Sequence, residues 1–144
     1  FTLNDFKDIQ LLNASQMNHL RRDFHVYKCW LKLDLEKLKR LQPRIIDVKG
    51  YSEVPYLSLD FALKSKYYAL EYYNLENNQF HIRLAKATGY NRIQDTDKVI
   101  YEIADKHGLN WTEDAYHKGF LIKTGNFNKS VSLLKDLMNE LESI

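Results

Sequence analysis

The fold is decided by the stretch Lys66-Tyr67-Tyr68-Ala69-Leu70-Glu71-Tyr72-Tyr73, in which four tyrosines lie within seven residues. This stretch is the centre of a longer segment, residues 55–87, in which apolar and polar residues alternate. Alternation is typical of strands, because successive side chains of a strand point to opposite faces of the sheet. Turn-forming residues divide the segment into three strands, which predicts an antiparallel meander.

The same alternation divides the four tyrosines between the two faces of the predicted sheet. Tyr68 and Tyr72 share a face with the apolar residues of the neighbouring strands, so we expect them in the core. Tyr67 and Tyr73 belong to the opposite face. If helices cover Tyr68 and Tyr72, we expect Tyr67 and Tyr73 to remain in solvent.

The residues before this segment predict one long helix from Ala14 to Leu41. Apolar residues recur there at intervals of three and four, and Pro43 disfavours helical geometry in the residue before it. A strand over residues 27–35 is the alternative, because apolar residues also alternate there. The strong helix formers of residues 35–41 favour the helix. Asp34 interrupts the apolar stripe, where burial without a partner would be costly.

The remaining elements follow from shorter patterns. Residues 44–48 predict a short strand, and residues 96–107 predict a helix that ends at Gly108. Residues 118–123 predict another strand, and a final apolar stripe predicts a helix that starts at Asn128 or Ser130. The expected fold is therefore a single α+β domain over residues 1–144. It has a mainly antiparallel meander of about four to five strands, with a long N-terminal helix and two further helices packed on it.

Composition limits the class of protein. The chain has 144 residues, of which 44% are hydrophobic and 28% charged, and no apolar run is long enough to span a bilayer. A net charge of +2 is too small to indicate a nucleic-acid binder by itself. The single cysteine, Cys29, favours a reducing, cytoplasmic setting, and we expect it to be buried in a helix. The chain starts without Met, which suggests a trimmed chain or a fragment of a longer protein, from which a targeting segment could have been removed.

The sheet face of Tyr67 supplies the first candidate binding site. Aromatic rings beside cations on an open sheet face are typical of single-strand nucleic-acid binders, in which bases stack on rings and cations meet phosphates. The acids Asp60 and Glu71 in the same region weaken that interpretation. A plain sheet surface or a protein interface is the alternative. The candidate binding residues are Tyr67, Tyr73, Lys64, Lys66, His81 and Arg83.

A second candidate is a metal-dependent nuclease. Asp47-Val48-Lys49 has the acid-x-Lys pattern in which acids hold a divalent metal and the lysine positions the attacking water. The pattern needs a second acid, for which Asp34 is available thirteen residues earlier. The catalytic residues of this alternative are Asp34, Asp47 and Lys49. The spacing of the histidines and the single cysteine predicts no metal site otherwise, and no cofactor is expected.

No catalytic signature stands out, so the sequence favours a non-enzyme. We expect a small non-catalytic binding or regulatory domain of bacterial or phage type that acts through protein–protein contact, without a membrane partner. The long helix from Ala14 to Leu41 is a possible interface. Nucleic-acid binding is the first alternative and the metal nuclease is the second.

Overall fold

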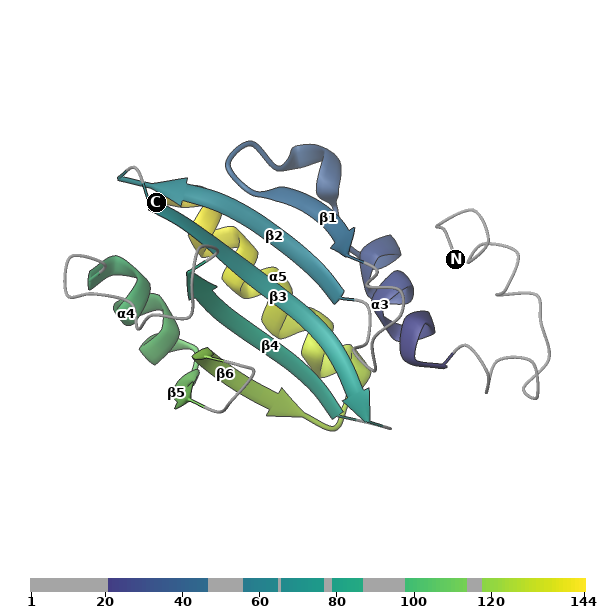
Figure 1. Ribbon diagram of the computed structural model, residues 1–144. Coiled ribbons are helices and arrows are strands. Elements are labelled where there is room, and N and C mark those ends of the chain that lie inside the picture. Colours follow the sequence, from purple (N-terminus) through teal and green to yellow (C-terminus); the bar gives the residue numbers. More distant parts are fainter. Residues whose placement is uncertain (1–20, 47–55, 65, 77–78, 87–97, 114–117) are drawn as a thin grey trace.

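The computed structural model describes residues 21–46, 56–64, 66–76, 79–86, 98–113 and 118–144 (Figure 1). With the labels of Figure 1, the elements are α3 (Arg21–Lys32), the short 3-10 helix η1 (Leu35–Lys37), β1 (Gln42–Ile46), β2 (Tyr56–Leu63), β3 (Lys66–Glu76), β4 (Gln79–Lys86), α4 (Lys98–Lys106), β5 (Asn110–Glu113), β6 (Lys118–Thr124) and α5 (Phe127–Ser143).

The described strands form one antiparallel sheet in the order β1-β2-β3-β4-β6-β5. The first four strands follow one another as the predicted meander. After α4, the chain forms β5 at the outer edge and then returns as β6, which lies between β4 and β5. The α+β class and the antiparallel sheet are confirmed. The count of four to five strands is wrong, since the sheet has six.

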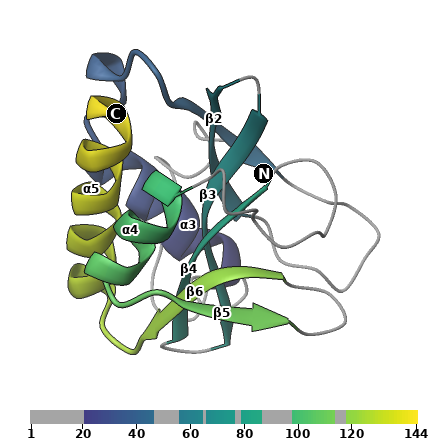
Figure 2. The same cartoon turned by 90° about the vertical axis from the view of Figure 1, so that its left-hand side faces the viewer.

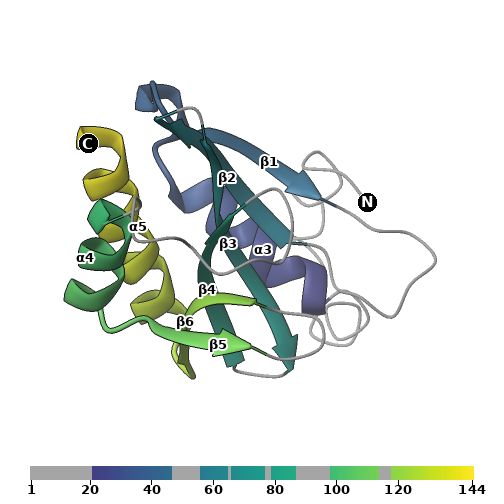
Figure 3. The ribbon, with the colours of Figure 1, turned by 60° about the vertical axis from the view of Figure 1, so that its left-hand side comes forward.

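The molecule has two layers, because α3, α4 and α5 lie on one face of the sheet (Figures 2 and 3). Rows of apolar cross-strand partners face these helices, and one such row joins Leu59, Leu70 and Leu84. Tyr68 and Tyr72 belong to the same face and are buried, which confirms the expectation that they are core residues. Burial of apolar side chains between the two layers is the main stabilising contribution to such a fold.

The predicted long N-terminal helix is wrong, and the longest described helix is the C-terminal α5. The N-terminal element α3 ends at Lys32, and residues 1–20 lie outside the described residues. The chain turns at Leu33, whose N–H donates to the carbonyl of Trp30 over 3.2 Å, and it is extended again by Leu38. Leu33 at the turn and Leu41 beyond it are both buried in the core.

A carboxylate from the far end of the chain stabilises this turn. Glu142 on α5 accepts hydrogen bonds from three successive backbone N–H groups, those of Lys39, Arg40 and Leu41. Arg40 N lies 2.7 Å from Oε2, and Leu41 N lies 3.1 Å from the same oxygen. Successive N–H groups that point to one place form an anion-binding nest, and here the anion is a side chain of the same protein.

The other local expectations agree with the structure. Gly108 has φ +75° after α4, which is the left-handed conformation expected of a glycine that ends a helix. Asn126 caps α5 by accepting a hydrogen bond from Lys129 N over 2.9 Å, so the helix starts slightly earlier than predicted. Among the described helices, none has the length and apolar character that crossing a bilayer requires.

Candidate functional sites

A row of polar side chains crosses the sheet face that lies away from the described helices. Arg44, Ser58, Glu71 and Arg83 are successive cross-strand partners on β1 to β4. The Arg83 Nε donates to Glu71 Oε1 over 2.7 Å, and both side chains are largely buried. A buried charge requires such a partner, because an unpaired ion in this environment would be strongly destabilising.

Arg44, at one end of this row, forms a second ion pair. The Nε of Arg44 lies 2.5 Å from Oδ2 of Asp60, and the hydroxyl of the buried Ser58 donates to Oδ1 of Asp60 over 2.7 Å. Burial raises the pKa of the neighbouring Tyr56, and the carboxylate of Glu71 raises it further. The phenol of Tyr56 is therefore a neutral hydrogen-bonding group at physiological pH. The two carboxylates described on this face, Asp60 and Glu71, are each paired with an arginine.

The structure does not bring the six predicted binding residues onto one exposed surface. Tyr73 and His81 are only 5% and 4% exposed and contact each other, with ring centroids 4.9 Å apart. Arg83 is held by Glu71. The expectation that Tyr67 and Tyr73 both remain in solvent is therefore wrong for Tyr73.

Tyr67 keeps the expected exposure and lies at the tip of the β2–β3 hairpin. Its side chain is 61% exposed, whereas the strand neighbours Tyr68 and Tyr72 are buried. Lys64 lies in the connecting turn with φ +51°, and its side chain is exposed. Strand alternation directs Lys66 to the face opposite Tyr67. The binding roles of these residues stay predictions.

Two contacts support the strands next to this tip. The rings of Phe61 and Tyr68 stack across the two strands with centroids 5.4 Å apart. Arg40 Nη1 donates to the carbonyl of Ala62 over 3.3 Å, and Ala62 is the cross-strand partner of Tyr67. The exposed ring of Tyr67 therefore lies next to strand residues that a pair of stacked aromatic rings and the arginine hydrogen bond support.

A basic hollow of about 550 Å³ lies between η1 and the C-terminal half of α5. Figure 2 shows η1 beside that end of α5. Leu38 and Met138 give the hollow an apolar part. Its wall carries four lysines, Lys32, Lys37, Lys39 and Lys135. Sequence reasoning missed this site, because its two sides are about a hundred residues apart in the chain.

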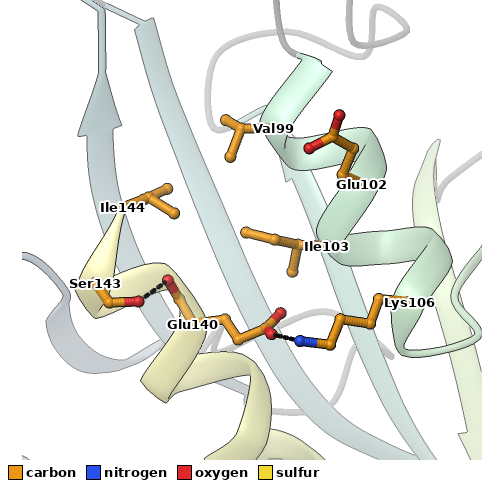
Figure 4. Close-up of a pocket in the computed structure, with 7 residues that line it drawn as sticks. All are labelled: Val99, Glu102, Ile103, Lys106, Glu140, Ser143 and Ile144. Atoms are coloured by element: carbon orange, nitrogen blue, oxygen red, sulfur yellow. Dashed lines mark hydrogen bonds and ion pairs between the residues drawn. The ribbon is translucent and has the colours of Figure 1, made fainter.

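A smaller pocket of about 260 Å³ separates α4 from α5 (Figure 4). Val99, Ile103 and Ile144 supply apolar atoms, and the pair of Lys106 with Glu140 closes one side. The hydrogen bond from Lys106 is the largest of the contacts that lower the pKa of Glu140. Its polar lining residues are Glu102, Lys106, Glu140 and Ser143, of which Lys106 and Glu140 are paired with each other.

Cys29 is buried in α3, as the sequence predicts. Burial raises the pKa of its thiol to about 12, so it is protonated and unreactive at neutral pH. Its thiol hydrogen-bonds to Tyr72, whose hydroxyl lies 2.7 Å from the hydroxyl of Ser130 on α5. This polar chain links α3, β3 and α5 inside the apolar core, and it serves the packing of the two layers.

The nuclease alternative is only partly within the described residues. Asp34 is 64% exposed and pairs with Lys37 over 3.2 Å, so its position in the predicted apolar stripe causes no burial of charge. Asp47 and Lys49 lie outside the described residues. Within the part of the chain that is described, no three His, Cys, Asp or Glu side chains gather in a way that could hold a metal ion.

The chain was compared with protein-family models, with curated proteins and with solved structures, and none of them matches it significantly.

Proposed function

We propose that this protein is a non-catalytic binding domain that contacts another protein through the tip of the β2–β3 hairpin. The observation that carries the proposal is that Tyr67 is 61% exposed. Among the described residues, the large hydrophobic side chains that are exposed are those of Tyr67 and Leu31. Tyrosine is enriched among the residues that dominate the binding energy of protein interfaces, because it offers a large ring and a polar end.

The contacts that support the tip favour this role. The stacked rings of Phe61 and Tyr68 and the hydrogen bond from Arg40 support the two strands next to the turn. A side chain that is already positioned before binding loses less conformational entropy when the partner docks. The exposed cation of Lys64 stands in the adjoining turn, so the complementary surface is an apolar pocket with an acidic rim.

A protein partner fits this geometry better than a single-stranded nucleic acid. Binding to a strand of bases uses several exposed rings in succession, together with free cations. Here Tyr73 and His81 are buried, and Arg83 is paired with Glu71. One exposed ring beside one exposed lysine suits an anchor that enters a pocket of a protein.

The test is site-specific photo-crosslinking in extracts of the cells that make the protein. A benzoylphenylalanine at position 67 is expected to give a discrete protein adduct, whereas the same group at position 31 on α3 serves as the exposed apolar control. The adduct identifies the partner, which is then purified. We expect Tyr67→Ala to weaken its binding by about 2 kcal/mol, or roughly 30-fold, and Leu31→Ala to leave the affinity unchanged.

Three results would contradict the proposal. A nuclease-sensitive adduct would favour the nucleic-acid alternative, and binding that weakens steeply with salt would support that alternative further. An adduct at position 31 instead of 67 would move the interface to α3. Equal affinity of Tyr67→Ala and the unchanged protein would remove Tyr67 as the anchor.

A further inference from the structure

The basic hollow between η1 and α5 is separate from the hairpin tip and has the features of a ligand site. Its volume of about 550 Å³ falls within the range of sites that hold small molecules, and Leu38 and Met138 supply apolar contact. The side chains of Lys32, Lys39 and Lys135 form no ion pair with any described residue. Three lysines without an ion pair to a described residue therefore line one concave surface.

The two carboxylates of the hollow form no ion pair with Lys32, Lys39 or Lys135, and each has other partners. Asp34 pairs with Lys37 over 3.2 Å. Glu142 uses its oxygens to accept from the backbone N–H groups of residues 39–41. The lining thus carries four lysines against two carboxylates, which leaves an excess of positive charge at the hollow.

We propose that this hollow binds a small molecule that carries two or more linked phosphate groups. Lysine recognises phosphate as a compact point charge with several donors, and three of these lysines have no other partner. A single phosphate bears at most about two charges at neutral pH, so a diphosphate or triphosphate matches the three free ammonium groups better. Leu38 and Met138 would contact the apolar or planar part of the same molecule.

The experiment is isothermal titration calorimetry of the whole chain with inorganic tripolyphosphate, followed by a nucleoside triphosphate. We expect one site with a Kd of roughly 100 µM or tighter at low salt, weakening as salt rises. The double variant Lys32→Glu with Lys135→Glu should weaken binding of tripolyphosphate at least about tenfold. A second double variant, Lys32→Gln with Lys135→Gln, should also weaken it, without placing new negative charge beside Asp34.

The matched control is Lys98→Glu with Lys129→Glu. Both lysines are exposed and lie outside the hollow, and the control has the same net charge as the first double variant. We expect its affinity to stay within about twofold of the unchanged protein, because these charges are screened from the site. Far-UV circular dichroism and unfolding midpoints show that each variant is folded.

Two outcomes of the binding measurements overturn the proposal. One is the absence of saturable binding of either phosphate compound to the unchanged protein. The other is an equal loss of affinity in the control, which would show that the anion follows net charge and not the hollow. Perturbed NMR signals of the Met138 methyl group and of the Leu38 amide would place the bound anion in the hollow, and signals confined elsewhere would refute it.

Discussion

Removal of the Glu142 carboxylate should detach the turn between α3 and β1 from the last turn of α5. The carboxylate accepts from three backbone N–H groups, with Arg40 N at 2.7 Å and Leu41 N at 3.1 Å from Oε2. A hydrogen bond to a charged group contributes about 1.5–3 kcal/mol when it is buried, and less where water can replace the acceptor. Because Glu142 is partly exposed, we expect Glu142→Ala to lower the free energy of unfolding by about 2–3 kcal/mol in total.

The variant Glu142→Gln separates charge from shape. Gln keeps one acceptor oxygen, so we expect about half of the loss, roughly 1–1.5 kcal/mol. Urea denaturation followed by circular dichroism measures both variants. Asp136→Asn is the control, because Asp136 is exposed on the same helix, and it should change stability by less than about 0.5 kcal/mol.

The pH dependence gives an independent check. Burial tends to raise the pKa of Glu142, but the hydrogen bonds from residues 39–41 and the charge of Arg40 outweigh it and hold the pKa below its usual value. A carboxyl whose pKa is lowered by folding stabilises the protein above its unfolded pKa of about 4.3, and this contribution disappears as pH falls through the folded value. The difference between Glu142→Gln and the unchanged protein should therefore shrink below about pH 4. A difference that is constant from pH 7 to pH 3, or a loss under 0.5 kcal/mol in Glu142→Ala, would refute this reasoning.

Three further predictions concern the core. Tyr72→Phe removes a buried hydroxyl that lies 2.7 Å from that of Ser130. We expect urea denaturation to show a free energy of unfolding that is lower by about 1–2 kcal/mol. An unchanged midpoint would contradict the role of the polar chain. Gly119→Ala places a Cβ about 3.0 Å from the carbonyl oxygen of Leu84, so it should lower the free energy of unfolding by about 1–3 kcal/mol. A variant as stable as the unchanged protein would argue against so close an approach of β4 and β6. Because burial raises the pKa of Cys29 to about 12, its thiol should resist iodoacetamide at pH 8 in the folded protein and react after unfolding; prompt labelling of the folded protein would show that Cys29 is accessible.

The sequence pattern predicted the central sheet well because each strand alternates within itself. The run from Lys66 to Tyr73 places Tyr68 and Tyr72 in the core, and the structure agrees. Strand β5 was missed because residues 110–113 are Asn-Trp-Thr-Glu, too short and too polar for alternation to be recognised. Its place at the edge depends on pairing with β6, which a local pattern does not reveal.

The break after Lys32 could not be predicted from local preference. Residues 35–41 are good helix formers, yet α3 ends at Lys32 and the chain reaches the core again at Leu41 in another direction. Glu142 stabilises the turn from about a hundred residues away. Tertiary contacts thus override helix propensity, which differs by less than about 1 kcal/mol between ordinary residues.

The candidate sites were predictable only in part for a related reason. Alternation indicated that Tyr67 is exposed, which is correct. It did not indicate that Arg44, Ser58 and Glu71 form one row, because that requires the register between strands. The hollow between η1 and α5 requires in addition the packing of segments that are remote in sequence.

The position of β6 between β4 and β5 has a consequence for synthesis on the ribosome. The strands β1 to β4 can pair in the order in which they emerge, since each is the neighbour of the one before it. The second edge of β4, however, has to wait until residues 118–124 have been made, because its partner β6 follows both α4 and β5 in the chain. During that interval the growing chain presents an open strand edge with Phe80, Ile82 and Leu84 on one side. An edge of this kind can recruit strands from other chains, so the nascent protein is exposed to aggregation until β6 has emerged and paired with β4.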